Sequence, residues 1–379
     1  MAKTVLRNEM DVRDFVRGCT LLGTGGGGLE ENGVQSLLSE LEAGKEIGWV
    51  DVEDVPDDAI TACPFLMGSI APHTPELIQE MDSYGMNDAS SLYTEKERIA
   101  HSITELSEYI GKKIDAVVPL ELGGASTPGC IGAGLVHGIP AVDADYTGRA
   151  IPEILQTTPY LRDMQLWPLA VVDEFGDTSI IKSSMNYRVV EKMGKKISEV
   201  AYGLTGDTGF VFTGKQMKEA ALKGTLSRCL KLGKMIREVG EAGGDPVEAI
   251  VNELGGYLLI KGILTKKETE DKQGYYWGFH TIEGDGAFAG DTVKIWFKNE
   301  NHVCWKNDAV AVTSPDSIIV VDRNTGMPYT NPRLAEGMEV AAFGIKAVDM
   351  FRSQKGIDVL GPRYFGFDFD YEPIEQRLK

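Results

Sequence analysis

The segment from residue 115 to residue 146 alternates between two patterns, and this alternation restricts the fold more than any other feature. The apolar stretch DAVVPLEL is followed by the small-residue segment GCIGAGLVHG and then by a second apolar stretch, IPAVDADY. Strand, helix and strand in this order form the βαβ unit of a parallel sheet. Upstream, an apolar strand over 58–71 and an amphipathic helix over 95–111 continue the alternation. We therefore expect an α/β domain with a largely parallel sheet over residues 1–170.

The pattern after residue 170 is different. We expect two short strands within 169–184, helices over 215–241 and 246–253, and then strands at 257–264, 275–282, 292–298, 302–306, 309–313, 317–322 and 339–345. Short strands separated by Gly, Asn and Asp indicate an antiparallel sandwich or barrel. Residues 171–379 are therefore predicted to form a β-rich, sandwich or barrel-like domain with inserted helices.

Charge and cysteine content limit the possible partners. The 379 residues include 38 basic and 57 acidic ones, a net charge of −19 that opposes binding to nucleic acid or anionic membranes. We find no signal peptide and no apolar run long enough to span a membrane, so we expect a cytoplasmic protein. Five scattered cysteines without a CxxC pair indicate reduced thiols. We expect a small-molecule substrate and a homo-oligomer.

Residues 23–28 contain five glycines, interrupted only by Thr24, between helices expected over 11–22 and 30–41. A Rossmann fingerprint needs a preceding strand and a Walker A loop needs Lys-Ser/Thr, and neither is present. A tight helix–helix turn would need only one glycine. We therefore favour a backbone that faces an anionic or carbonyl-bearing ligand. The predicted substrate-binding residues here are Thr24, Gly25, Gly26, Gly27 and Gly28.

A second cluster follows the strand at 115–122. Glu121 precedes Gly123 and Gly124 at the carboxyl end of that strand, the edge where parallel sheets bind ligands. Glu121 could act as a base or hydrogen-bond acceptor, with the glycine amides forming an anion nest. The alternative is a strand-end turn in which glycine merely tolerates positive φ.

The third cluster, VDADYTGRAIPE over 142–153, contains most of the remaining candidate catalytic and binding residues. Asp143 and Asp145 leave a strand on the same face, where paired carboxylates can bind a metal or position water as a general base. Arg149 offers a clamp for a substrate carboxylate, with Glu153 beside it. Alternatively, Asp145 caps a helix and Arg149 pairs with Glu153.

Other candidates favour packing roles. His280 is the best placed of five histidines, none of which has zinc-site spacing. Cys130 could be activated at a helix start, and Cys19 precedes the glycines, but both fit a buried core. The segment 299–301 could reach across a domain interface, although a hairpin turn is the preferred interpretation.

Taken in order, GCTLLGTGGGG, PLELGGA, GIPAVDADYTGRAIPE, WFKNEN, SPDSIIVVD and GPRYFGFDFDY resemble the S-methyl-thiohydantoin desulfurase domain family over nearly the whole chain. That family is often found beside or fused to hydantoinase/oxoprolinase proteins. The resemblance implies an α/β domain followed by a β-rich domain, and a possible hydantoinase-like partner subunit. Where many relatives have Asn after the Gly-Gly pair, this chain has Ala125-Ser126. The recurring family residues are Gly25–Gly28, Glu121, Gly123, Gly124, Asp143, Asp145, Gly148, Arg149 and Glu153.

The resemblance also implies action on a five-membered ring, in which water replaces methanethiol on an S-methylated thiohydantoin bearing a carboxylate side chain. We expect Asp143 or Asp145 as base with Glu121 as its partner, Arg149 on the substrate carboxylate, and glycine amides as donors. No organic cofactor is expected, and a divalent metal on the aspartates is left open. The alternatives are an ATP-dependent ring-opening enzyme or subunit, and a non-catalytic binding module.

Overall fold

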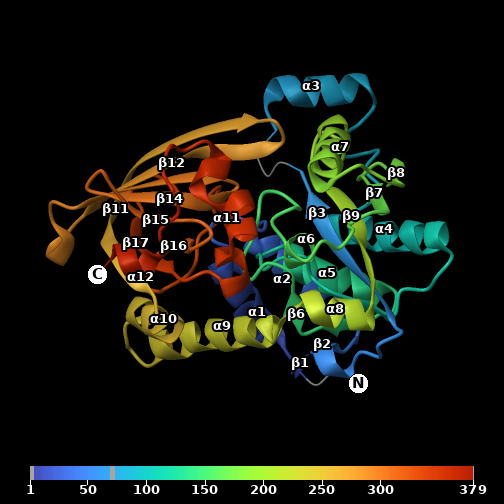
Figure 1. Ribbon diagram of the computed structural model, residues 1–379, viewed down its shortest axis with the longest axis horizontal. Helices are drawn as coiled ribbons and strands as arrows, with labels where there is room; N and C mark the ends of the chain where they lie inside the picture. Colours follow the sequence, from blue (N-terminus) through green and yellow to red (C-terminus); the bar gives the residue numbers. More distant parts are fainter. Residues whose placement is uncertain (1–3, 69–72, 379) are drawn as a thin grey trace.

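The computed structural model describes residues 4–68 and 73–378. An N-terminal α/β part lies beside a C-terminal antiparallel sheet (Figure 1). The N-terminal sheet has the order β1-β2-β5-β4-β3-β9-β7-β8 and is parallel from β2 to β3. Its strands are β1 (Thr4–Leu6), β2 (Ile47–Val50), β3 (Ile60–Met67), β4 (Ala116–Val117), β5 (Ala141–Val142), β7 (Leu169–Val172), β8 (Thr178–Ile181) and β9 (Thr205–Thr213). Of the strand expected over 58–71, residues 69–71 lie outside the described residues.

Helices cover both faces of this sheet, because successive residues of its central strands enter different cores. In β3, Ala62 joins the apolar cluster under one helical layer and Cys63 joins the cluster on the opposite face. The first layer contains α1 (Glu9–Leu22), α2 (Glu30–Glu42), α4 (Glu95–Ile110) and α5 (Ser126–Val136). The opposite face is covered by α6 (Thr158–Leu161), α7 (Tyr187–Val200) and α8 (Gly214–Ala220), and α3 (Pro75–Ser83) lies beyond α7 at the top of Figure 1.

The C-terminal sheet is antiparallel throughout and has the order β15-β14-β13-β12-β11-β17-β16. Its two edge strands, β15 and β16, come close to each other, so the sheet curls towards a barrel. Its strands are β11 (Tyr257–Lys272), β12 (Tyr275–Gly284), β13 (Thr292–Lys298), β14 (Glu300–Lys306), β15 (Ala309–Thr313), β16 (Ser317–Asp322) and β17 (Glu339–Ile345). The predicted fold class, α/β followed by a β-rich barrel-like part, is confirmed. Short helices complete the chain: η1 (Val52–Asp54), η2 (Gly286–Phe288), η3 (Asp349–Arg352), α11 (Gln354–Leu360), η4 (Pro362–Phe365) and α12 (Ile374–Arg377).

The single helix expected over 215–241 is wrong, because the chain turns twice within it. Ala221 is extended and Gly224 has φ of +76°, which divides the segment into α8, β10 (Leu222–Lys223) and α9 (Thr225–Glu241). The strand β10 pairs with β6 (Ala144–Asp145). Both β8 and β9 follow residue 171 yet belong to the N-terminal sheet, and the division into domains near residue 170 stays a prediction.

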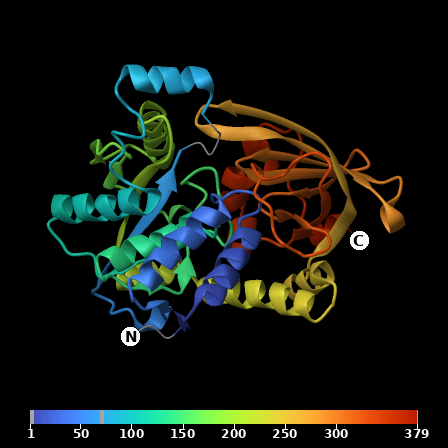
Figure 2. The ribbon, with the colours of Figure 1, turned by 180° about the vertical axis from the view of Figure 1, so that it is seen from behind.

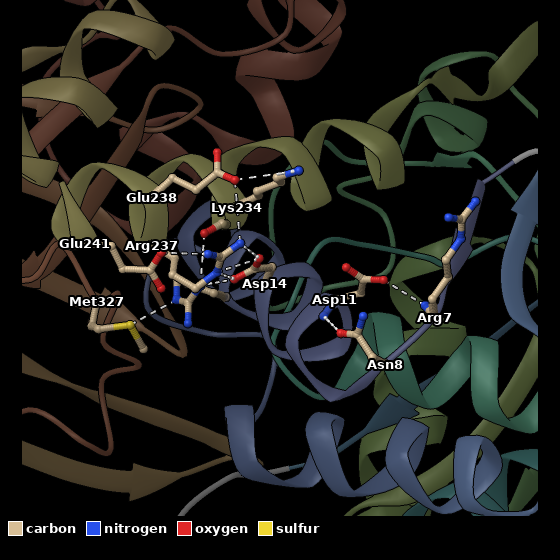
Figure 3. Close-up of polar contacts among 11 residues, drawn as sticks. Arg7, Asn8, Asp11, Asp14, Lys234, Arg237, Glu238, Glu241 and Met327 are labelled. Carbon is tan, nitrogen blue, oxygen red and sulfur yellow. Dashed lines mark hydrogen bonds and ion pairs between the residues drawn. The ribbon is translucent and has the colours of Figure 1, made fainter.

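Two glycines bring α1 and α9 into direct backbone contact. A Cβ atom on Gly18 would lie 1.8 Å from the carbonyl oxygen of Cys229, and one on Gly233 would lie 1.7 Å from that of Asp14. The buried Asp14 carboxylate accepts bonds from Arg237 Nε and Nη2 at 3.0 and 2.9 Å (Figure 3). From this contact α9 and α10 (Pro246–Leu254) extend beneath the C-terminal sheet (Figure 2). The two parts of the molecule therefore share one apolar core.

Candidate active site between the two sheets

A small cavity lies where the N-terminal sheet meets the C-terminal sheet. Its volume is about 60 Å³, which exceeds the roughly 10–15 Å³ needed for one water molecule. The cavity is lined by the glycine segment, the ends of β3 and β4, the start of α5, the inner face of α7 and the β13–β14 turn. Its charged lining residues are Glu121, Glu153, Glu191, Lys195 and Glu300.

Glu121 and Glu300 reach the cavity from different sheets, and both are buried. Glu121 Oε2 accepts a hydrogen bond from the amide of Ile151 at 2.8 Å. Glu300 Oε2 has no hydrogen-bond partner among the described residues. Burial raises the pKa of Glu121 to about 7, and burial together with the charge of Glu121 raises the pKa of Glu300 well above its ordinary value. Burial therefore favours the protonated form of Glu300, while Glu121 titrates near neutral pH.

Lys195, on α7, supplies the positive charge among the described residues that line the cavity. Its buried ammonium donates a bond of 3.3 Å to the carbonyl oxygen of Gly68 and lies 4.4 Å from the centre of the Tyr275 ring. Burial lowers its pKa, and the charge of Glu191 opposes this effect. Because an ammonium has three donors, Lys195 retains donor capacity for an acceptor in the cavity.

The other two glutamates are held by partners around the rim. Glu191 accepts bonds from the amide of Ile154 at 2.8 Å and from the Tyr275 hydroxyl at 3.0 Å. Glu153 is bonded to Lys298 and to the Tyr364 hydroxyl. Their oxygens therefore frame the cavity, whereas those of Glu121 and Glu300 have fewer partners.

The glycine run joins α1 to α2, as expected, but most of its bare backbone faces other parts of the protein. Only Gly27 and Gly28 line the cavity within the described part of the chain. Cβ atoms on Gly25, Gly26, Gly27 and Gly28 would lie 2.7, 1.8, 2.4 and 2.5 Å from Asn331 Nδ2, Glu300 Oε1, Gly123 Cα and Ala125 Cβ, respectively. Gly123 and Gly124 pack beneath the run and do not themselves line the cavity.

Arg149 is buried, and its guanidinium is directed at backbone and hydroxyl acceptors. It donates to the carbonyl oxygens of Ala150, Pro315 and Asn301 and to Thr24 Oγ1 at 3.0–3.3 Å. The amide of Asn301 in turn donates to the Thr24 carbonyl oxygen at 2.8 Å. Arg149 and Thr24 therefore join the two sheets, and neither lines the cavity.

Asp143 and Asp145 also lie outside the cavity lining. The carboxylate of Asp143 accepts from the amide and hydroxyl of Ser227 at the start of α9, at 3.0 and 2.5 Å. Buried Asp145 Oδ2 accepts from the amides of Thr147 and Gly148 at 2.9 and 2.6 Å, which organises the turn before Arg149. Burial raises the pKa of Asp145 to about 6. Glu121 thus faces the cavity and the two aspartates do not line it, although Asp145 is near enough for its charge to help raise the pKa of Glu121.

No group of three or more His, Cys, Asp or Glu in the described ranges is arranged to hold a metal ion. His280 is buried, stacked on Phe297 with ring centres 4.6 Å apart, and 3.0 Å from Asn331 Oδ1. Burial lowers its pKa to about 3, which fits the packing role. Cys19 and Cys130 are buried free thiols.

Glu191 and Lys195 were not recognised from the sequence, and Glu300 was considered only in the interface interpretation that was not preferred. The segment 299–301 does form a turn, as preferred, but it also carries Glu300 across the interface, which was the interpretation set aside. Glu191 and Lys195 are four residues apart on α7, so they share one helical face. A helical pattern over 187–200 was the available signal for them, and that helix was not predicted.

The fold and the cavity define a class: a two-part α/β and β-barrel-like protein with an acid pair and a lysine that line a cavity at the junction. The family model described as S-Me-THD-like, N-terminal domain, matches residues 10–183, and the S-Me-THD-like, C-terminal domain, matches residues 184–374. The chain belongs to this S-Me-THD-like family, which confirms the resemblance to the S-methyl-thiohydantoin desulfurase domain.

The fold has been seen before. A crystal structure of a protein from Chromobacterium violaceum is similar with a TM-score of 0.76 and 20% sequence identity, covering 98% of this chain and 100% of that one. At this identity the similarity concerns the fold alone. A search of curated proteins found no match. Within the described residues, no helix is long and apolar enough to cross a membrane.

Proposed function

We propose that this protein is a hydrolase of small five-membered cyclic imide- or amidine-type rings, and that its substrate is an S-methyl thiohydantoin. The observation that carries the proposal is the acid pair of Glu121 and Glu300 lining one cavity with Lys195. The family description supports the choice of ring.

The cavity suits a ring with neighbouring N–H, C=N and C=O groups. Lys195 donates to a carbonyl oxygen, which fixes the ring and withdraws electrons from it. Deprotonated Glu121 accepts a proton from water, and protonated Glu300 donates one to a ring nitrogen. The two glutamates divide the roles of base and acid in this proposal because burial favours the protonated form of Glu300, while Glu121 titrates near neutral pH.

The reaction balances with water alone. As Glu121 removes a proton, the water oxygen bonds to the ring carbon that carries the S-methyl group, and the C=N electron pair moves to the nitrogen protonated by Glu300. The resulting hydroxyl then transfers its proton to Glu300, which had become deprotonated, as the carbonyl forms. The C–S bond breaks, and methanethiolate takes the proton held by Glu121. The products are a hydantoin and methanethiol.

The test is methanethiol release from S-methyl thiohydantoin without nucleotide, with hydantoin detected by mass spectrometry. Glu121→Gln should lower the rate about 10²–10⁴-fold because it removes the base, whereas Glu42→Gln at an exposed position of α2 should not. Wild-type turnover retained in Glu121→Gln would contradict the base assignment. Ring opening that requires ATP would favour the hydantoinase-type alternative, and ligand binding without any product would favour a binding module.

A further inference from the structure

A second and larger pocket, of about 670 Å³, lies beside the cavity. It is lined by α7, the strands β12 and β13, and the C-terminal segment 354–371. Its walls include the aromatic side chains of Trp277, Tyr364, Phe365 and Tyr371. Glu153 lines both this outer pocket and the inner cavity.

The Glu153 carboxylate and its two hydrogen-bond donors lie between the inner cavity and the outer pocket. Lys298 Nζ is bonded to Glu153 Oε1, and the Tyr364 hydroxyl is bonded to Glu153 Oε2. Both donors line the outer pocket. A ring that enters the inner cavity from this side must therefore displace Glu153 from at least one of them.

The two donors are anchored in different ways. Lys298 lies 3.9 Å from the centre of the Tyr275 ring and 5.2 Å from that of Trp277, so its ammonium stays stabilised when Glu153 leaves. Tyr364 lies in the short η4 turn between Gly361 and Gly366, and Gly366 has φ of +89°. Arg363 in the same turn forms exposed ion pairs with Asp368 and Asp370, which contribute little. Arg188 also contacts the Tyr364 ring, with its Cζ atom 5.2 Å from the ring centre, so a movement of Tyr364 that opens the barrier must break this contact as well as the bond to Glu153.

We propose that the outer pocket is the entrance and outer half of the ligand site, and that Glu153 is the gate between its two halves. When Glu153 is displaced, Lys298 and Tyr364 become free to donate to the ligand. The outer half therefore takes a ring substituent that ends in a carbonyl or carboxylate oxygen. The inference rests on the proposed function only in that it places the reacting ring in the inner cavity.

The gate can be tested without turnover, because Lys195 reports access to the inner cavity. Cyanate adds to a neutral amine to form a urea, and the modified Lys195 peptide is quantified by mass spectrometry. Tyr364→Phe removes one charge-assisted hydrogen bond from the gate, so carbamylation of Lys195 should become about tenfold faster. An unchanged rate in this variant would overturn the gate.

Two internal comparisons keep the result specific. Tyr371→Phe alters the same pocket wall, but its hydroxyl bonds Asp316 rather than Glu153, so the Lys195 rate should stay at the wild-type value. Exposed Lys192 on the same helix should react equally in all variants. Faster modification of Lys195 in Tyr371→Phe as well would show general loosening and overturn the proposal.

Failures of the two proposals are distinguishable. If S-methyl thiohydantoin is not hydrolysed but Tyr364→Phe still exposes Lys195, the proposed function fails and the gate stands. If thiol is released but Lys195 reacts at one rate in every variant, the gate fails and the reaction stands. With both intact, Tyr364→Phe should change KM more than the equivalent change at Tyr371.

Discussion

Replacing Arg149 by lysine separates two interpretations of this residue. If Arg149 is the substrate clamp that the sequence predicts, lysine would retain the positive charge, and the substitution would weaken mainly substrate binding. In the structure, the guanidinium instead makes four hydrogen bonds to Ala150, Pro315, Thr24 and Asn301. A lysine ammonium cannot span all four acceptors, because they surround a planar fork.

The expected loss of stability follows from these bonds. Losing two of the four, at about 1.5–3 kcal/mol for each bond to a charged group, lowers the free energy of unfolding by about 4 kcal/mol. An unfolding entropy of about 2.1 cal/mol/K per residue gives roughly 0.8 kcal/mol/K for a chain of this length. Arg149→Lys should therefore lower Tm by about 5 °C.

Scanning calorimetry and urea unfolding measure this change directly. Arg13→Lys is the matched control, because Arg13 forms an exposed ion pair with Glu9 and should alter stability by no more than about 0.5 kcal/mol. A variant with unchanged Tm and a KM for S-methyl thiohydantoin raised tenfold or more would refute the structural role and restore the clamp.

Three further outcomes test other parts of the structure. Because Glu121 must be deprotonated to act as base, turnover should rise with pH through about 7, and a pH–rate profile without that limb would remove the assignment. Buried Asp207, with Oδ2 unpartnered among the described residues, has a pKa raised to about 8. The folded state therefore holds a proton that the unfolded state loses, so wild type becomes less stable as pH rises from about 4 to about 8. Over this range the free energy of unfolding of Asp207→Asn, measured with urea, should increase by a few kcal/mol relative to wild type. A difference that stays constant with pH would contradict this. Gly27→Ala should cost several kcal/mol more than Gly44→Ala, because both have φ near +75° but only Gly27 would clash; equal losses in chemical denaturation would exclude the clash.

The elements that could be predicted are those with local signals. The strands from 257 onwards alternate between turn residues and apolar runs, and β3, α4 and α5 follow the same kind of pattern. The strand β9 carries no comparable signal. Its segment TGDTGFVFT contains two glycines, and Phe210 has φ of +51°, so its extended form depends on its antiparallel partners β3 and β7. Tertiary pairing, rather than propensity, determines this strand.

The candidate site was predictable only in part, for a related reason. The strand-end rule identified Glu121, Asp143 and Asp145 equally, because it specifies an edge of the sheet and not the space beyond it. Asp143 differs from Glu121 because its carboxylate accepts a hydrogen bond from the amide of Ser227 at the start of α9. Glu300 comes from the other sheet, and no rule of local spacing relates it to Glu121.

The glycine run shows why the two sheets must be considered together. A helix–helix turn would account for one glycine, and a ligand would account for the two that line the cavity. Gly25 and Gly26 have no space for a side chain because Asn331 and Glu300 of the C-terminal part approach them. A side chain at Gly26 would occupy the position of Glu300 Oε1. The absence of a Cβ there allows a carboxylate from the C-terminal sheet to face Glu121, so the acid pair depends on the junction between the two sheets.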